Sequence, residues 1–517
     1  MEEFRENILN WYQFKNTDDV LEIGDSGITK MLIRKCNKVM TVKKDIKTTE
    51  ISRKFDYIIM IGIIGNIEEI FGERVKLSEL VVFLEKYLKE NGKFLIAVDN
   101  KFGLRYFAGN PENILNSRYK SLIGYSNEEE KIETFTKKSL KSKLENIGYH
   151  TNFYYPLPDY KLPNVIFSDK SLPKYNTIDK YVPYCKDGVK TVINEIDVFR
   201  EILKEDENQF EFFANSFLVE ASKVKTPIKY KYISFNNMRK PRYRLITKIA
   251  DEYVEKETVN SDSEEHYNQI KNNIEILKND KIKLLDDAVD GIIRSKYIEQ
   301  KYMLSNVITE LLEKNETKQV EKILKKYIDI LNKNSYIEED YEQNVFKRYG
   351  IKLENPELLK ELHFKENGFW DMTFKNCFYV DDELYFFDQE WNEKFLPAEY
   401  ILYHSIVYTI SLRRFINVDD WLEKYDLIKY LKIFKELDDK LQEDVRDSKV
   451  WDFFHQNKYV DIDATIQELE NMKIREKSQQ EAYDNLKAEY DSYKKKVQNT
   501  KPYKIYKAVK NITKRKK

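Results

Sequence analysis

The chain has 517 residues, among them 88 basic and 89 acidic side chains, and it is 41% apolar and 14% aromatic. This composition excludes a disordered protein, and the near-zero net charge gives no sign of a nucleic-acid-binding protein. By length alone we expect about three domains.

Cys36, Cys185 and Cys377 lie far apart in the sequence. Because they form no C-x-x-C pair, they predict neither a zinc site nor a disulfide framework, which fits a reducing compartment. Residues 1–10 lack the apolar core of a secretory signal, and the longest apolar run, 57–64, is too short to span a bilayer. We therefore expect a cytoplasmic protein, either soluble or peripheral to a membrane.

The first 160 residues alternate between short apolar runs and helical patterns. Strands are predicted at 20–23, 39–42, 55–64 and 93–98, and helices at 28–34 and 77–89. Such alternation indicates an open α/β sheet with parallel strands. A glycine turn, Gly24 to Gly27, follows the first strand, where backbone N–H groups and a helix N-terminus face a nucleotide in such sheets.

This region resembles the class I S-adenosylmethionine-dependent methyltransferases. Glu22 to Gly27 stands where the family has its E-x-G-x-G-x-G loop, and the runs 99–109 and 154–163 are similar to methyltransferases encoded with bacterial surface-polysaccharide genes. The resemblance implies a Rossmann-like fold and S-adenosylmethionine binding by Glu22, Gly24 and Gly27. It also implies an acidic ribose ligand after the second strand.

The sequence departs from that family in three places. The glycine loop is shortened and lacks its middle glycine, and Lys43 occupies the position of the acidic ribose ligand. Asp45 replaces that ligand only if the second strand ends later. A carboxylate usual near Gly65 is also missing. Two interpretations stay open, a working methyltransferase and a catalytically silent scaffold.

Residues 210–221 alternate like an edge strand that closes the first domain, and we place the boundary near Lys225. Three short strands are then predicted at 230–235, 244–249 and 253–256, followed by a helix whose buried face includes Tyr267 and Ile270. A small antiparallel sheet followed by a helix is the plan of a kinase N-lobe.

The segment 369–391 contains Asp371 and Asn376 in a D-x-x-x-x-N loop, and a predicted hairpin then leads to Asp388. Phosphoryl transfer from ATP uses a carboxylate beside the acceptor hydroxyl, an amide oxygen on a metal ion, and a second metal-binding carboxylate. The alternative is a plain hairpin with solvated acids. With the terminal Asp-x-Glu-Trp, the segment resembles the aminoglycoside-phosphotransferase and choline-kinase branch of the kinase fold.

That resemblance implies the base Asp371 and the Mg²⁺ ligands Asn376 and Asp388, with Glu390 as a supporting group. Its phosphate-clamping lysine corresponds to Lys256, with Lys248 as the fallback.

The helical spacing selects Glu264, rather than Glu265, as the acidic partner of this lysine. In the same scheme, the segment 296–299, ending at Glu299, is the hinge whose backbone receives adenine. No glycine occurs in 228–256, so Arg239, Lys240 and Arg242 either bind phosphates or form a solvated basic turn.

Residues 466–497 form a charged helical pattern, either a coiled coil or a solvated helix. Residues 501–517 hold eight basic and no acidic side chains, with apolar residues on one helical face. This pattern favours an interfacial helix on an anionic membrane over a basic arm for nucleic acid.

The order of parts resembles the bifunctional methyltransferase and kinase proteins that modify the non-reducing end of growing bacterial O-polysaccharides. We expect a methyltransferase-like domain at 1–225, a two-lobed kinase-like α+β domain at 226–455, a charged helix at 456–500 and a basic tail at 501–517. The resemblance implies ATP, Mg²⁺ and S-adenosylmethionine, a polysaccharide or lipid-linked glycan acceptor, and glycosyltransferases of the same pathway as partners. It places the protein at the inner face of the cell membrane. The rivals are a catalytically silent scaffold and a small-molecule kinase.

Overall fold

The structure is a computed structural model that describes residues 2–113, 115–125, 133–175, 177–178, 189–337, 344–353, 355–455 and 459–514. The chain forms two compact units. The first contains Met1–Gly188 and Asn194–Asn457, and the second contains Val189–Ile193 and Lys458–Lys517.

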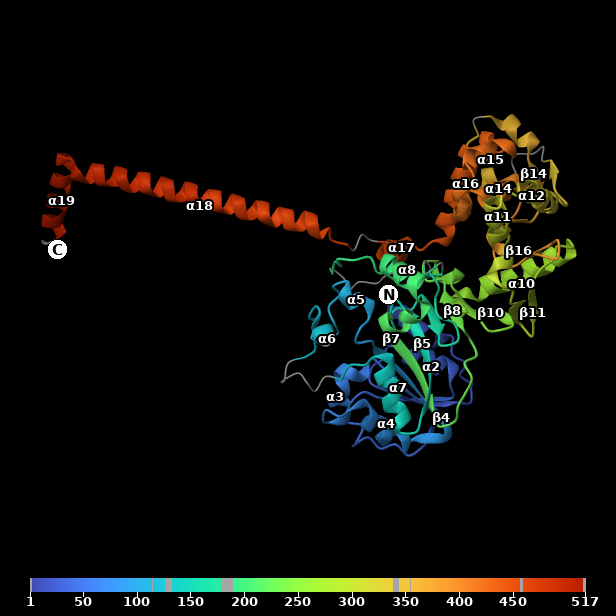
Figure 1. Cartoon of the computed structure of the whole chain (residues 1–517), viewed down its shortest axis with the longest axis horizontal. Helices are drawn as coiled ribbons and strands as arrows, with labels where there is room; N and C mark the ends of the chain where they lie inside the picture. Colours follow the sequence, from blue (N-terminus) through green and yellow to red (C-terminus); the bar gives the residue numbers. More distant parts are fainter. Residues whose placement is uncertain are drawn as a thin grey trace. The chain divides into compact units, whose positions relative to one another are not determined.

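A twelve-stranded sheet is the centre of the first unit (Figure 1). Its order is β11-β12-β10-β9-β8-β6-β5-β7-β4-β3-β1-β2. The strands are β1 Asp19–Ile23, β2 Lys38–Val42, β3 Phe55–Ile61, β4 Leu88–Asp99, β5 His150–Leu157, β6 Val165–Ser168, β7 Ser216–Ser222, β8 Tyr232–Phe235, β9 Leu245–Ile249, β10 Tyr253–Thr258, β11 Asp286–Val289 and β12 Ile292–Lys296.

The N-terminal half of this sheet confirms the expected open α/β arrangement. Strands β1 to β4 pair in parallel. Alternate residues of β4 enter two different cores: Phe94 and Ile96 pack on one face, while Leu95 and Ala97 pack on the other. Helices cover both faces, which is why successive residues of β4 in this stretch are apolar on both sides.

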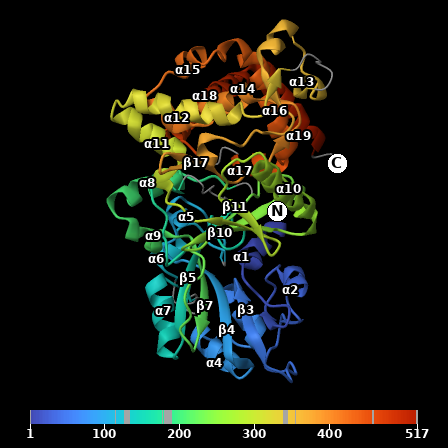
Figure 2. The same ribbon diagram turned by 90° about the vertical axis from the view of Figure 1, so that its right-hand side faces the viewer.

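The helices of this half are α1 Asn7–Asn10, α2 Thr29–Lys35, α3 Ile67–Phe71, α4 Leu77–Glu85, α5 Leu104–Phe107, α6 Lys120–Ile123, α7 Lys137–Asn146, α8 Glu195–Glu205 and α9 Phe210–Phe213. Figure 2 shows α2 and α7 on opposite sides of the strands.

The strand predicted at 210–221 is confirmed only over 216–221, and its expected place at the edge is wrong. Residues 210–213 form α9, and β7 begins only at Ser216. Strand β7 lies between β4 and β5, is antiparallel to both, and has every residue buried. Glu220, one of the polar residues in that run, is buried and accepts hydrogen bonds from Tyr12 and Thr226.

The sheet continues across the boundary expected near Lys225. Strand β6 pairs with β8, with Ile166 opposite Ile233, and β8 begins an antiparallel run of five strands. Helix α10, Glu264–Asn279, packs on this run through Tyr267, Ile270 and Ile274.

A helical core follows, with Tyr327, Tyr403 and Phe434 at its centre. Its main helices are α11 Leu304–Glu313, α12 Thr317–Leu331, α14 Ala398–Tyr408, α15 Val418–Lys424 and α16 Leu431–Val445. Helix α17 Ser448–His455 packs separately, through Val450 and Phe454 against Phe4 and Leu162. Short strands accompany the main helices: β13 Tyr336–Ile337, β14 His363–Lys365, β15 Gly368–Phe369, β16 Cys377–Val380, β17 Glu383–Phe386, β18 Asn392–Glu393 and β19 Leu396–Pro397. The predicted hairpin is present, since β16 pairs with β17 in antiparallel register.

The second unit contains α18 Ile462–Asn499 and α19 Lys501–Lys514. Neither helix has a buried residue. In the part of the chain that the structure describes, none of the helices has the length and apolarity needed to cross a membrane.

Cys36 and Cys377 are buried free thiols, and Cys185 lies outside the described residues.

Candidate functional sites

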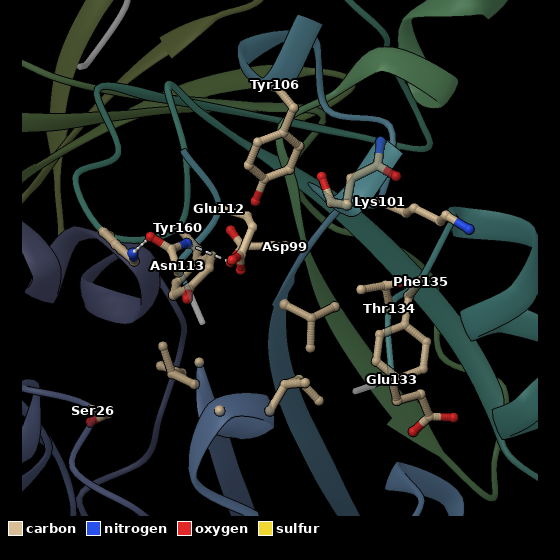
Figure 3. Close-up of a pocket in the computed structure, with 18 of the residues that line it drawn as sticks. Ser26, Asp99, Lys101, Tyr106, Glu112, Asn113, Glu133, Thr134, Phe135 and Tyr160 are labelled. Atoms are coloured by element: carbon tan, nitrogen blue, oxygen red, sulfur yellow. Dashed lines mark hydrogen bonds between the residues drawn. The ribbon is translucent and has the colours of Figure 1, made fainter. Parts of the chain in front are cut away.

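The first candidate site is a cavity of about 340 Å³ at the carboxyl ends of parallel strands (Figure 3). Asp25 and Ser26 follow β1, Gly62 follows β3, and Asp99 ends β4; all four line the cavity. Open α/β sheets bind ligands at this edge, because the loops that follow parallel strands meet there.

The glycine loop has the backbone that the sequence suggested. Gly24 and Gly27 have φ of +86° and +76°, in the left-handed region that side chains rarely adopt. A Cβ on Gly27 would lie 3.1 Å from Cδ of Arg5, so this glycine lets the arginine cross the loop closely. Arg5 also lines the cavity.

Glu22 lies beneath this loop and is fully buried. Its carboxylate accepts hydrogen bonds from Ser26, from Thr29 Oγ1 at 2.7 Å and from Thr41 Oγ1 at 2.8 Å. These bonds join β1, the loop, α2 and β2. Glu22 therefore fixes the shape of the loop, and it does not line the cavity.

The structure does not bring Asp45 to this cavity. Asp45 is exposed with φ of +49°, and its backbone N–H bonds to Glu69 O of α3 at 3.3 Å. Strand β2 ends at Val42, so the strand does not extend far enough for Asp45 to replace the missing acid. Lys43 instead pairs with Asp25, at 2.8 Å.

A buried arginine organises the far side of the cavity. Arg105 donates hydrogen bonds to Asp99, Asp159 and the hydroxyl of Tyr106. Burial favours its neutral form, but Tyr106, Asp99 and Asp159 hold the pKa of the guanidinium well above its usual value. The two sequence runs that carried the resemblance, 99–109 and 154–163, thus meet in one network.

Asn113, Tyr160 and Lys161 add further polar groups there. Figure 3 shows Asn113 beside Asp99, where Asn113 Nδ2 donates to Asp99 Oδ2 at 2.6 Å. Lys161 Nζ donates to Oδ1 of the same asparagine at 2.5 Å. Burial lowers the pKa of Lys161 and raises that of Tyr160, so the phenol stays protonated at neutral pH. None of these residues could be predicted individually from the sequence, because the hydrogen bonds of the network join segments that lie far apart in the chain.

The second candidate site is a cavity of about 420 Å³ beside the hairpin β16–β17. Asp371, Asn376 and Asp388 all line it, so the structure brings the three predicted residues together. Asp371 is held by the backbone of the segment after the hairpin, since its Oδ2 accepts from the N–H groups of Glu390 at 2.6 Å and Trp391 at 3.3 Å.

The other oxygen of Asp371 has the properties of a proton acceptor. Oδ1 is buried and has no hydrogen-bond partner. Burial raises the pKa of this carboxyl to about 8. A base with a pKa near the working pH combines a useful ionised fraction with a real affinity for the proton.

Asn376 and Asp388, which line the same cavity as Asp371, offer oxygen atoms for a metal ion. Asn376 Nδ2 donates to Asp371 O at 3.0 Å, which leaves the amide oxygen as the free ligand. Asp388 has φ of +61°, and its N–H bonds to Asp286 Oδ2 at 2.6 Å. No group of three or more His, Cys, Asp or Glu side chains within the described ranges could hold a metal ion. Two oxygen ligands still fit Mg²⁺, which commonly takes its remaining ligands from phosphates and water.

Lys256 reaches this site from β10. It forms ion pairs with Asp388 and with Glu390, both more than 130 residues away along the chain. The fallback Lys248 does not reach it: that lysine is fully buried on the opposite face of the sheet and pairs with Glu255 and Glu257.

The expected pair of Lys256 with Glu264 is absent. Glu264 is exposed in the first turn of α10, and the helix turns His266 and Asn273 toward the site instead. His266 Nε2 lies 3.5 Å from Glu390, and Asn273 Nδ2 bonds to the backbone oxygen of Glu390 at 3.1 Å. The predicted buried face of the helix is confirmed, since Tyr267 and Ile270 are buried. The choice of Glu264 is wrong because the helix faces Glu390 with His266 and Asn273, which carry no apolar signal.

Glu390 is the buried anion at the centre of this site. Burial favours its neutral form, but Arg239 and Lys256 overcome that effect and hold its pKa well below the usual value. Glu390, expected only as a supporting group, is thus a direct partner of Lys256 beside Asp388.

The basic turn between β8 and β9 is bonded to the helical lobe. Arg239 pairs with Glu390, and Lys240 and Arg242 pair with Asp444 at 3.5 and 2.9 Å. Lys240 N–H also bonds to Val445 O at 2.9 Å. Arg242 is exposed, as in the solvated alternative, and Arg239 is instead paired with the buried Glu390. Phosphate binding by this turn stays a prediction.

Glu299 follows β12 at the expected connection to α11. Its side chain is exposed and pairs with Lys301 at 3.0 Å. The adenine contact expected from the backbone of this segment stays a prediction.

Among the comparisons with known proteins, only the one with solved structures finds similar proteins. No family model matches the chain, and no curated protein matches it. Solved structures similar to it include a SAM-dependent methyltransferase from Archaeoglobus fulgidus, with 14% identity over 43% of this chain and 95% of that one, and a TM-score of 0.25. A second is a phosphoethanolamine N-methyltransferase from Haemonchus contortus in complex with phosphomonomethylethanolamine and S-adenosylhomocysteine, with 12% identity over 43% and 52% and a TM-score of 0.24. A third is a cyclopropane-fatty-acyl-phospholipid synthase-like protein from Lactobacillus casei, with 10% identity over 43% and 90% and a TM-score of 0.23.

Proposed function

We propose that this chain is a transferase that modifies the end of a bacterial cell-surface polysaccharide, with a phosphoryl-transfer site at Asp371. The observation that carries the proposal is the convergence of Asp371, Asn376 and Asp388 on one cavity, with Lys256 in contact with Asp388. A carboxylate base, two oxygen ligands for a cation and a phosphate-binding lysine are the parts that phosphoryl transfer requires.

In this mechanism, Asp371 Oδ1 accepts the proton of an acceptor hydroxyl. The hydroxyl oxygen forms a new bond to the γ-phosphorus of ATP, the bond from that phosphorus to the β–γ bridging oxygen breaks, and ADP leaves. Lys256 binds the phosphates, which requires it to release Asp388. A bound Mg²⁺, held by Asn376 and Asp388, would neutralise phosphate charge.

When Lys256 releases Asp388 and binds a phosphate, it keeps its ion pair with Glu390. Arg239 and Lys256 both contact Glu390, so the carboxylate keeps the lysine extended toward the cavity. This is the role that the sequence analysis expected of Glu264.

We further propose methyl transfer from S-adenosylmethionine at the cavity beside Asp25. When bound, this cofactor supplies an electrophilic methyl group on a sulfonium. Arg5 and Asp25, which both line the cavity, carry the charges that suit its carboxylate and ammonium groups. The fit is incomplete at the ribose, whose hydroxyls need a carboxylate after β2. Lys43 occupies that position and pairs with Asp25, and Asp45 does not line the cavity.

The sharpest test of the main proposal is transfer of radiolabelled γ-phosphate to the co-encoded polysaccharide. Asp371→Asn should lower the rate by at least about 10²-fold, the usual contribution of a general base. Asp382→Asn is the matched control, because Asp382 is an exposed acid in the turn of the same hairpin. Equal rates for both variants would overturn the role of Asp371.

The two rivals give different results in the same assay. A scaffold transfers no phosphate to any acceptor and shows no stabilisation by Mg-ATP. A small-molecule kinase phosphorylates a free amine-bearing substrate and leaves the glycan unlabelled.

A further inference from the structure

One cation that lines the Asp371 cavity has no acidic partner. Arg239 and Lys375 are the arginine and lysine side chains among the lining residues. Arg239 is paired with the buried Glu390. Lys375 forms no ion pair or side-chain hydrogen bond with any of the residues that the structure describes. Its charge is therefore available to a ligand in the cavity.

Lys375 also differs from an ordinary surface lysine. Its side chain reaches solvent, but burial lowers the pKa of the ammonium group, and among the described residues no carboxylate lies close enough to oppose that effect. An ammonium group that has lost part of its water attracts an anion more strongly than one fully in solvent. The acids of the cavity and this lysine thus leave room between them for an anionic group.

The backbone that carries Lys375 is fixed. The lysine lies in a short 3-10 helix, Phe374–Asn376, which follows Asp371. Phe374 packs in the helical core, where its side chain is fully buried. Asn376 O accepts a hydrogen bond from Phe387 N–H at 3.0 Å, which joins the loop to the end of the hairpin. The ammonium group is therefore tethered between the proposed base and a proposed metal ligand.

Lys256 does not fill this place. It is not among the lining residues of the cavity, and it contacts two of them, Asp388 and Glu390. Asp371 lies in the cavity, so the hydroxyl that it deprotonates and the phosphorus that this hydroxyl attacks must lie there too. A cation that acts on the transferred group has to line the same cavity, as Lys375 does.

We propose that Lys375 binds the γ-phosphoryl group of ATP and stabilises it during transfer. This inference rests on the proposed phosphoryl-transfer function and adds a catalytic residue to it. Lys256 then binds the phosphates that stay on ADP.

The chemistry of the step explains why a cation is needed there. As the acceptor oxygen bonds to the γ-phosphorus and the bond to the β–γ bridging oxygen breaks, negative charge spreads over the other three oxygens of the phosphoryl group. The ammonium group of Lys375 donates hydrogen bonds to these oxygens and keeps its own proton, while Asp371 takes the proton of the hydroxyl. Hydrogen bonds between charged groups are roughly twice as strong as neutral ones.

The test compares Lys375→Met with Lys325→Met, an exposed lysine of α12 that does not line the cavity. The measured quantity is the transfer of radiolabelled γ-phosphate to the co-encoded polysaccharide. Lys375→Met should lower kcat by at least about 10²-fold, the usual loss when one group that stabilises transition-state charge is removed. Lys325→Met should keep the wild-type kcat. Lys375→Arg keeps the charge and should recover part of the lost rate.

Two results of this assay would overturn the assignment. The first is a kcat for Lys375→Met equal to that of Lys325→Met. The second is a raised KM for the acceptor with an unchanged kcat, because the lysine would then bind the acceptor instead of the phosphoryl group. Melting temperatures of the variants show whether each keeps the fold.

A binding measurement tests the same contact without turnover. Calorimetric titrations with Mg-ADP and with the non-hydrolysable analogue Mg-AMP-PNP separate the γ-phosphate from the rest of the nucleotide. Lys375→Met should raise the Kd of Mg-AMP-PNP about ten-fold, as expected for one hydrogen bond between charged groups, and leave the Kd of Mg-ADP unchanged. Equal changes for both nucleotides would contradict a contact with the γ-phosphate.

The two measurements together separate this inference from the proposed function. Phosphoryl transfer by the wild type, with the rate and the nucleotide affinities unaltered in Lys375→Met, would refute the role of Lys375 alone. Binding of Mg-AMP-PNP that depends on Lys375, without transfer to any acceptor, would refute the proposed function and keep Lys375 as a ligand of the γ-phosphate. A wild type that binds neither nucleotide would refute both.

Discussion

Lys256 and Asp388 form an ion pair although 132 residues separate them in the sequence. The lysine comes from an antiparallel strand and the aspartate from the end of a hairpin in the helical part. Glu390, two residues further on, is a second partner of the same ammonium group. The pair therefore joins two parts of the chain at the cavity that we assign to phosphoryl transfer.

Replacement of Lys256 should remove most of the response to nucleotide. A ligand that binds only the folded protein raises its stability by about 2.7 kcal/mol at a concentration of 100 Kd. We expect Mg-ATP to raise the melting temperature of the wild type, and to raise that of Lys256→Met by a clearly smaller amount. Lys278→Met, at an exposed position of α10 that does not line the cavity, is the control and should respond like the wild type. Identical shifts in all three proteins would place ATP elsewhere.

The phosphoryl-transfer rate should rise with pH. Asp371 must be ionised to accept a proton, and its pKa is raised by burial to about 8. At saturating ATP, kcat/KM for the acceptor should increase through pH 7 to 9 and then level off. A flat profile over this range would exclude Asp371 as the titrating base.

The same raised pKa predicts how stability depends on pH. Because the folded-state pKa lies above the unfolded value of about 3.9, the stabilising contribution is complete below pH 4 and is lost as pH rises through 8. The stability of wild type relative to Asp371→Asn should fall across this window, as measured by urea unfolding at several pH values.

Glu390→Gln should destabilise the protein strongly. Removing one partner of a buried ion pair typically costs about 3–5 kcal/mol, because the remaining charges stay buried without compensation. Here Arg239 and Lys256 would both lose their common anion. Glu383→Gln, an exposed glutamate of β17 paired with Lys283, should change the free energy of unfolding little. Similar unfolding curves for both variants would show that the buried cluster contributes little.

S-adenosylmethionine should stabilise the wild type if the first cavity binds it. Asp25→Ala should weaken this effect without changing the stability of the free protein, because Asp25 and its partner Lys43 are both exposed. Glu50→Ala, an exposed acid that does not line the cavity, is the control. No change in melting temperature for the wild type would favour the silent scaffold for this half of the chain.

The basic helix α19 should bind anionic vesicles. Its Ile505, Val509 and Ile512 are exposed, and each lysine near such a surface adds about 1 kcal/mol. Sedimentation with phosphatidylglycerol vesicles should retain the full chain at low salt and lose it at high salt. A chain that ends at Thr500 should stay in the supernatant, and equal retention of both chains would exclude α19 as the membrane contact.

The sequence by itself determined features that depend on neighbouring residues. The strands β1 to β4, the glycine loop, the hairpin β16–β17 and the order of Asp371, Asn376 and Asp388 all follow from local patterns of apolar and turn residues. Tertiary structure decided the partners. It replaced Glu264 by Glu390 at Lys256, moved Asp45 out of the first cavity, gave Arg105 its two carboxylates, and bound the basic turn to Asp444. Periodicity shows which face of an element is buried, but an ion pair depends on the distance between two charges, and only the folded chain sets that distance.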